Sequence, residues 1–198
     1  MPSPARLISE DLERVLLAPA DAVTLDVRGR SVAAVLVALF AQDGDLRAVL
    51  TRRREDLRRH PGEISFPGGR RDVTDRDLQA TALREAHEEI GLHPEAVEII
   101  GALQPTPTIA TGYAVYPFVG LIEPGQAWKL SPREVAEVLE LPLTSIRAGY
   151  ARRRLVRRAI PIRTDTYIVD EVLIWGATAR ILADLFDRIG PLLDRNAD

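Results

Sequence analysis

The spacing of apolar residues along the chain predicts several β-strands. Residues 31–41 (SVAAVLVALFA) form an apolar run of the length of a buried strand, and the turn QDGD separates them from a second such segment, LRAVLTRR. The two segments together are typical of a β-hairpin. Further strands are expected at residues 96–103 and 114–122, because the segment between them, QPTPTIATGY, is rich in turn-forming residues.

The same pattern predicts helices near both ends and in the middle of the chain. Residues 9–18 carry apolar side chains at helical spacing behind a serine in the N-cap position, and residues 176–189 (GATARILADLFDRI) are amphipathic. A third helix is expected at residues 76–90, with Gly91 as its C-cap. The segment SPREV predicts a serine-capped helical turn before a short strand.

The remaining segments have the character of loops and hairpins. Residues 62–75 are rich in glycine and charge, which predicts a loop with a short strand at residues 63–66. The segments RRLVRRAIPIRT and TYIVDEVLIW have hairpin character. Mixed strands with two substantial helices predict an α+β fold or an α/β/α sandwich.

Length and composition suit a single domain over residues 1–198, with a helical extension over about residues 1–25. No apolar run approaches the roughly 20 residues of a membrane helix, and no cleavable signal is recognisable, so we expect a cytoplasmic protein with no membrane partner. The absence of cysteine excludes disulfides and thiolate metal sites. A net charge of −3 gives no reason to expect nucleic acid as a partner, and a homodimer stays open.

The helix expected at residues 76–90 gathers negative charge on one side. At about 100° per residue, Glu89 lies roughly 40° from Glu85 and Glu88 lies about 60° to the other side, so the three share an arc of about 100°. Like charges one turn apart cost a few tenths of a kcal/mol per pair. One interpretation is a solvated acidic face that Arg84 partly neutralises, and the other is a cation site.

The segment before this helix, FPGGRRDVTD, favours the cation site. Its two glycines allow backbone carbonyls to turn inward. Hard divalent cations such as Mg²⁺ prefer oxygen ligands and are usually held by a few carboxylates and substrate phosphates. A glycine carbonyl and two or three helix carboxylates would bind such a cation and leave positions for water and a diphosphate.

Residues 69–92 resemble the Nudix box, in which a glycine and a glutamate precede the motif Arg-Glu-(apolar)-x-Glu-Glu-x-Gly-(apolar). The second half, REAHEEIGL, matches at every specified position: Arg84, Glu85, Ala86, Glu88, Glu89, Gly91 and Leu92. The first half departs twice. Asp75 stands where the pattern has a glutamate, and eight residues separate it from Arg84 where seven are usual.

The resemblance implies a fold, a reaction and a set of site residues. The fold would be an α/β/α sandwich around a mixed sheet, and the reaction would be hydrolysis of a nucleoside diphosphate linked to another moiety. Glu85 and Glu89 would be the principal ligands of Mg²⁺ or Mn²⁺, with the backbone of Gly69. Glu88 would contribute to metal binding or act as a base, and Arg84 would orient the neighbouring glutamates.

Two further acidic positions are candidates for the same site. Asp75 occupies the early acidic position of the box. Glu134 and Glu137 lie where related enzymes often place a late acidic residue near the metals, so Glu134 is a candidate base or extra ligand, and a surface helix is the alternative. His87 and His93 are expected on the surface, because His87 points away from the carboxylate arc and His93 follows the helix cap. Neither is a candidate metal ligand, since the spacing of the histidines is not that of a zinc site.

Residues 50–69 resemble a signature that precedes the box in the coenzyme A pyrophosphatase branch of the family. The branch usually has serine at Arg54 and valine at Ile64, and the late segment IWGATARIL also looks like that branch. The matching positions of the signature are Leu50, Thr51, Arg53, Leu57, Arg58, His60, Gly62, Phe66, Pro67, Gly68 and Gly69.

The charges of this segment give a weaker, independent argument for the same substrate. Coenzyme A carries a diphosphate and a 3′-phosphate, and the forked side chain of arginine suits phosphate oxygens. The segment contains several arginines between residues 52 and 59. Because alternate residues of a strand face opposite sides, only some of these arginines can reach one ligand. Arg53, Arg58 and His60 are the candidates to bind substrate or hold the loop. A basic solvent-facing edge is the alternative, and His60 has the alternative of bracing its loop.

A second basic segment, ARRRLVRR, has three interpretations. It could form a second anion site, a nucleic-acid patch or a solvated strand edge, and the lack of interleaved aromatic residues favours the solvated edge.

The leading hypothesis is a Mg²⁺- or Mn²⁺-dependent hydrolase of the diphosphate bond of coenzyme A or its derivatives, with this small molecule as its partner. The products would be 4′-phosphopantetheine, or its acyl form, and adenosine 3′,5′-bisphosphate. One alternative is a Nudix hydrolase of another diphosphate, such as ADP-ribose, a dinucleotide or a capped RNA end. The other is a nucleotide-binding regulatory module without catalysis.

Overall fold

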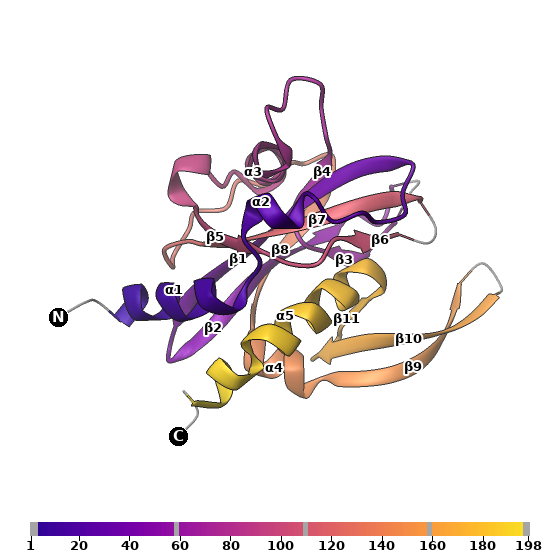
Figure 1. Cartoon of the computed structure of the whole chain (residues 1–198). Coiled ribbons are helices and arrows are strands. Elements are labelled where there is room, and N and C mark those ends of the chain that lie inside the picture. The colour runs from indigo at the N-terminus through magenta and orange to yellow at the C-terminus, as the bar shows by residue number, and fades with distance from the viewer. Residues whose placement is uncertain (1–3, 58–59, 109–110, 158–159, 196–198) are drawn as a thin grey trace.

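A computed structural model describes residues 4–57, 60–108, 111–157 and 160–195, and its centre is a mixed β-sheet (Figure 1). The central strand β1 (Ser31–Gln42) pairs in parallel with β7 (Tyr113–Leu121) and antiparallel with β2 (Asp45–Arg53). Its interior residues are almost all buried because both faces of the sheet are covered. The shorter strands all pair antiparallel with these three: β3 (Ile64–Ser65) and β8 (Val135–Pro142) with β2, β4 (Gly68–Arg70) with β1, and β5 (Glu98–Ala102) and β6 (Thr106–Pro107) with β7.

Helices cover the two faces of this sheet. The helix α3 (Leu78–Ile90) packs on one face, where Ala82, Ala86 and Ile90 are fully buried in one hydrophobic cluster with side chains of β1. On the other face lie α1 (Pro4–Val15) and α5 (Gly176–Arg195) (Figure 1). The chain is therefore an α/β/α sandwich around a mixed sheet.

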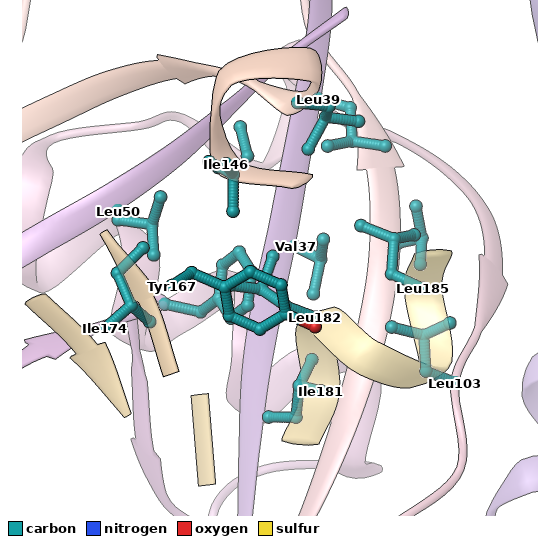
Figure 2. Packing of buried hydrophobic residues seen from close by; sticks show 14 of the residues in the cluster. Val37, Leu39, Leu50, Leu103, Ile146, Tyr167, Ile174, Ile181, Leu182 and Leu185 are labelled. Atoms are coloured by element: carbon teal, nitrogen blue, oxygen red, sulfur yellow. The ribbon is translucent and has the colours of Figure 1, made fainter. Parts of the chain in front are cut away.

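A second hydrophobic cluster joins the sheet to the C-terminal part of the chain. In Figure 2, Val37 and Leu50 of the sheet lie near Leu182 of α5 and near Tyr167 and Ile174. The last two residues belong to a smaller antiparallel sheet of β9 (Tyr150–Arg157), β10 (Ile160–Val169) and β11 (Val172–Trp175). The chain also contains three short helices: α2 (Pro19–Ala22), the 3₁₀ helix η1 (Pro94–Ala96) and α4 (Leu143–Ala148).

The fold confirms the expected hairpins and the central strands, and it corrects several helix boundaries. The helix α1 starts at Pro4 and ends at Val15, so Ser9 does not cap it. Instead Ser9 lies inside the helix, largely buried, and its hydroxyl donates to Glu13 one turn later. The helix α5 continues past residue 189 to Arg195, because Leu193 still packs into the core.

Two other segments differ in their outcome. The segment SPREV forms the expected single turn, in which the carbonyl of Ser131 accepts from the amides of Glu134 and Val135, and β8 follows it from Val135. The loop expected at residues 62–75 contains β4, which the sequence did not predict. The prediction of one domain with a helical extension stays a prediction. None of the helices in the described part of the chain has the length and apolar character of a membrane span.

Candidate active site

The helix α3 places two of the predicted glutamates directly beside β4. The helix begins behind Asp77, whose carboxylate accepts a hydrogen bond from the amide of Ala80 at 2.7 Å, and it ends at Gly91 in the left-handed conformation. The sequence predicted a start two residues earlier. The helix keeps Glu85, Glu88 and Glu89 on one arc, but this arc is not uniformly exposed: the Glu88 side chain is 57% exposed, whereas Glu89 is only 6% exposed and lies on the buried side of the helix. The side of α3 that carries Glu89 faces the sheet, because the small alanine side chains of this helix allow close packing.

Glu89 has an unusual environment for a carboxylate. Its Oε2 accepts a hydrogen bond from the amide of Gly68 at 3.1 Å. Burial raises the pKa of Glu89 to about 7, although the Gly68 amide and Arg53 act in the opposite direction. The nearby carboxylates of Glu134 and Glu85 raise this pKa further. Glu89 is therefore a buried carboxyl group, and a positive charge next to it would stabilise its ionised form.

The two glycines of β4 are required by close contacts on both sides. A Cβ atom on Gly69 would lie 2.5 Å from the carboxyl carbon of Glu85, and one on Gly68 would lie 2.3 Å from the carbonyl oxygen of Ala34. Gly68 also has φ of +153°, which side chains disfavour. The pair of glycines thus lets the strand pass between β1 and α3 while the Glu85 carboxylate rests on it.

Arg84 ties the loop before the helix to the carboxylates on it. Its Nε and Nη2 donate to the two carboxylate oxygens of Asp75 at 2.8 and 3.1 Å, and its Nη1 lies 3.2 Å from Glu88. Nη2 also lies 2.9 Å from Glu85 and donates to the carbonyl of Arg70 at 3.0 Å. This geometry fits the role that the resemblance implies for Arg84, which is to orient the neighbouring glutamates.

Asp75 does not join the glutamates, although its position in the box made it a candidate there. Its carboxylate also accepts hydrogen bonds from the Thr81 hydroxyl at 2.9 Å and from the Asp72 amide at 2.8 Å. Together with the contacts from Arg84, these hold the pKa of Asp75 far below its usual range. Asp75 therefore positions Arg84.

Arg53 and Glu134 complete the cluster from the other side. Nη1 of Arg53 lies 3.9 Å from Oε1 of Glu89 and 3.6 Å from Oε2 of Glu134. The Glu134 side chain is 51% exposed, so one of its faces is open to water. The amide of Arg54 donates to the carbonyl of Glu134, which fixes this loop to the end of β2.

The other basic residues at the end of β2 point elsewhere, as strand alternation predicts. Arg52 pairs with Glu137 at 2.9 Å, and Arg54 pairs with Asp56 at 2.8 Å. The His60 ring contacts the carboxylate of Glu63, an arrangement that braces the loop. Arg58, predicted to bind substrate or hold the loop, lies outside the described residues.

The arrangement fits a divalent cation by the chemistry of its donors. Glu85, Glu89 and Glu134 offer carboxylate oxygens, burial raises the pKa of both helix glutamates, and each of the three carboxylates repels the others. A cation would relieve this cost. Within the described residues no three acids or histidines already stand together as a ligand set; Arg84 contacts Glu85, and Arg53 lies near both Glu89 and Glu134.

Sequence reasoning missed two polar groups in this region. The amide of Gly68 was not singled out, although the double glycine of FPGG was a signal for close backbone approach. Thr81 was read only as a helix residue, whereas its buried hydroxyl fixes Asp75. No sequence signal identified Thr81, because the spacing of residues in a helix does not reveal which group outside the helix a threonine hydroxyl will hydrogen-bond.

Comparison with known proteins identifies a family. The model of the family described as "NUDIX domain" matches residues 30–159 of this chain. The protein "Uncharacterized Nudix hydrolase NudL" of Enterobacter sp. (strain 638) is 42% identical over 167 residues, which cover 83% of this chain and 86% of the relative. The protein of the same description from Salmonella newport is also 42% identical, over 144 residues that cover 72% of this chain and 74% of the relative.

Solved structures show the same fold at low sequence identity. A MutT/nudix family protein from Enterococcus faecalis has a TM-score of 0.52 at 16% identity, covering 96% of this chain and 76% of its own. The NUDIX domain of Shewanella oneidensis NrtR, complexed with ADP ribose, has a TM-score of 0.50 at 21% identity, covering 65% of this chain and 86% of its own. Because the family description covers more than half of the chain and the NudL relatives match most of it, the chain belongs to the Nudix hydrolases, which act on nucleoside diphosphate derivatives and generally use divalent metal ions.

Proposed function

We propose that this Nudix hydrolase cleaves the diphosphate bond of coenzyme A or one of its derivatives with Mg²⁺ or Mn²⁺. The products are 4′-phosphopantetheine, or its acyl form, and adenosine 3′,5′-bisphosphate. The observation that carries the diphosphate chemistry is the meeting of Glu85 and Glu89 with the two glycines of β4, with Arg53 and Glu134 opposite.

The choice of coenzyme A is supported by the segment that enters this site. Residues 50–69 carry the resemblance to the coenzyme A pyrophosphatase branch, and they run from the end of β2 to β4. Both ends of the segment touch the glutamates, through Arg53 at one end and through Gly68 and Gly69 at the other. A signature with both ends in the candidate site is well placed to select a substrate.

The surroundings of each residue support a particular role in the reaction. Glu85 and Glu89, with Glu88 and the carbonyl of Gly69, would hold the cation, which when bound neutralises phosphate charge and activates water. Glu134 is the carboxylate most open to solvent on the far side of Arg53, and it is suited to accept a proton from the attacking water.

Arg53 is suited to contact the diphosphate. Its side chain is 26% exposed, and its Nε is buried with no hydrogen-bond partner among the described residues. Glu89 would hold a cation that offsets its charge, and Arg53 would then be able to direct one of its forked donors toward a phosphate oxygen. Arg53 would then stabilise the charge of the leaving phosphate.

A substrate panel tests the proposal. The purified protein would be assayed with Mg²⁺ or Mn²⁺ on free, oxidised and acylated coenzyme A, 3′-dephospho-coenzyme A, ADP-ribose, a dinucleotide and a capped RNA. ADP-ribose belongs in the panel because a structural neighbour was solved with it. A member of the coenzyme A group should be cleaved fastest, and Glu89→Gln should abolish that signal in a matched preparation.

Each other outcome of the panel has a defined meaning. Preference for ADP-ribose or another diphosphate would overturn the coenzyme A proposal and leave the family assignment intact. Binding without turnover of any substrate would identify a regulatory module.

A further inference from the structure

Arg180 is a half-buried cation that no carboxylate neutralises within the described part of the chain. Its Nη2 donates to the carbonyl oxygen of Pro107, at the end of β6, and its Nε is buried without a hydrogen-bond partner. Burial alone lowers the pKa of Arg180, with no acidic group acting in the opposite direction. Such a group is costly unless an anion joins it.

The neighbouring residues of α5 show that this lack of a partner is built into the helix. Asp184, one turn after Arg180, is at the spacing from which a helix usually forms an ion pair. However, Asp184 instead accepts from Arg188 at 3.1 Å and from the amide of Gln104 at 2.8 Å. The acid that could neutralise Arg180 is thus held by other donors.

Strand register places Arg180 at the same end of the sheet as the candidate active site. Thr106 of β6 is opposite Val115 of β7, Val115 is opposite Ala33 of β1, and Ala33 is opposite Arg70 of β4. Three strand spacings put β6 about 14 Å from β4 within the sheet, and α5 covers the face of the sheet opposite to α3. A substrate that contacts both the glutamates and Arg180 would therefore extend around this end of the sheet.

The first turn of α5 is fixed to the segment that carries the glycines. The hydroxyl of Thr178 donates to the carbonyl of Ile64 in β3 at 3.1 Å, four residues before Gly68. Arg180 follows Thr178 by two residues on the same helix and is therefore held at a fixed place relative to the chain that enters the site. A preorganised cation at this position loses little freedom when an anion binds.

We propose that Arg180 binds a phosphate group of the substrate other than the diphosphate, and we assign this group to the 3′-phosphate of coenzyme A. The assignment rests on the proposed function. The nearer cation, Arg53, already faces Glu89 and Glu134, so a third phosphate needs a positive group elsewhere. The side chain of Arg180 is partly exposed, and its Nη groups carry more donors than the one that the Pro107 carbonyl accepts, so they can donate to a phosphate.

The experiment compares coenzyme A with 3′-dephospho-coenzyme A for the unmodified enzyme, Arg180→Met and Arg180→Lys. Arg180→Met should lower kcat/KM for coenzyme A by about tenfold to a hundredfold, mainly through KM, and leave the dephosphorylated analogue nearly unchanged. Arg180→Lys should recover part of the loss, because an ammonium keeps the charge without the fork. The control Arg14→Met removes an exposed arginine of α1 and should keep the substrate ratio. An equal loss on both substrates, or none, would overturn the proposal.

A binding measurement separates this proposal from the proposed function. Adenosine 3′,5′-bisphosphate should raise the melting temperature of the unmodified protein more than AMP does, and Arg180→Met should remove that difference. If the unmodified protein cleaves ADP-ribose and not coenzyme A, the proposed function fails, and a preference for the bisphosphate that still depends on Arg180 would sustain the phosphate site. A preference that survives in Arg180→Met would refute it. Should the Met variant not fold, the same comparison in Arg180→Lys decides.

Discussion

Replacing Glu89 by glutamine should make the metal-free protein more stable at alkaline pH and nearly inactive. Glutamine keeps the shape of the side chain, and its oxygen can still accept the hydrogen bond from the Gly68 amide. What disappears is a negative charge inside the protein, where Glu89 is only 6% exposed. The same charge is the one that we propose binds the cation, so stability and activity should change in opposite directions.

The size of the stability effect follows from the pKa of Glu89. Burial raises this pKa from its ordinary value of 4.5 to about 7 in the folded protein, so the folded state holds the proton more tightly than the unfolded chain. The contribution of Glu89 to the free energy of unfolding is therefore highest below about pH 4.5 and falls as the pH rises from 4.5 to 7. A tenfold change in proton affinity is worth about 1.4 kcal/mol, so the fall amounts to about 3 kcal/mol.

Urea denaturation in the presence of EDTA measures this effect. At pH 8, Glu89→Gln should unfold with a free energy about 3 kcal/mol higher than that of the unmodified protein, and at pH 4.5 the difference should nearly vanish. Glu95→Gln makes the same chemical change on the exposed helix η1 and should show no such pH dependence. Turnover of Glu89→Gln should fall by at least about a hundredfold. Equal stabilities at pH 8 would refute the burial argument, and near-normal activity would refute the role in metal binding.

Two further predictions concern the same cluster. Mg²⁺ or Mn²⁺ should raise the melting temperature by mass action, and changing Glu85, Glu88 and Glu89 together to glutamine should abolish that rise; a rise that persists in the triple variant would place the cation elsewhere. Gly69→Ala should lower turnover with little loss of secondary structure by circular dichroism, because the new methyl group would displace the Glu85 carboxylate, and normal turnover would show that Glu85 is not needed at its present position.

The sequence predicted the parts of the fold that depend on local pattern. The hairpin of β1 and β2 and the cap at Gly91 follow from apolar runs, turn residues and a glycine, all within a few neighbouring positions. The acidic helix was likewise recognisable from its spacing and its family motif. The pairing of β4 with β1 was not, because three residues of a glycine-rich strand carry no apolar period.

In the candidate site, too, the sequence predicted what depends on neighbouring positions and not what depends on tertiary packing. Spacing alone placed Glu89 with its neighbours on one arc, yet the sheet beneath the helix buries it, and burial is a property of the tertiary structure. Similarly, the strand alternation of the arginines was predictable, but which of them meets Glu89 depends on β4 and on the loop before β8. Arg180 could not be foreseen, since its significance depends on its own burial and on the pairing of Asp184 with other donors.

The early acidic position of the Nudix box gives a last prediction. Asp75 is one methylene shorter than glutamate, and it closes a turn over residues 72–75, with the Asp75 amide donating to the Asp72 carbonyl and the Asp72 amide donating back to the Asp75 carboxylate. This turn brings the short carboxylate to Arg84 at 2.8 Å. Asp75→Glu, which restores the family residue, should overpack this buried site and lower the free energy of unfolding by about 1–3 kcal/mol in urea. An exposed change, Glu95→Asp, should leave stability nearly unchanged. If Asp75→Glu were as stable as the unmodified protein, the loop would be adaptable, and the turn at residues 72–75 would not require the shorter acid.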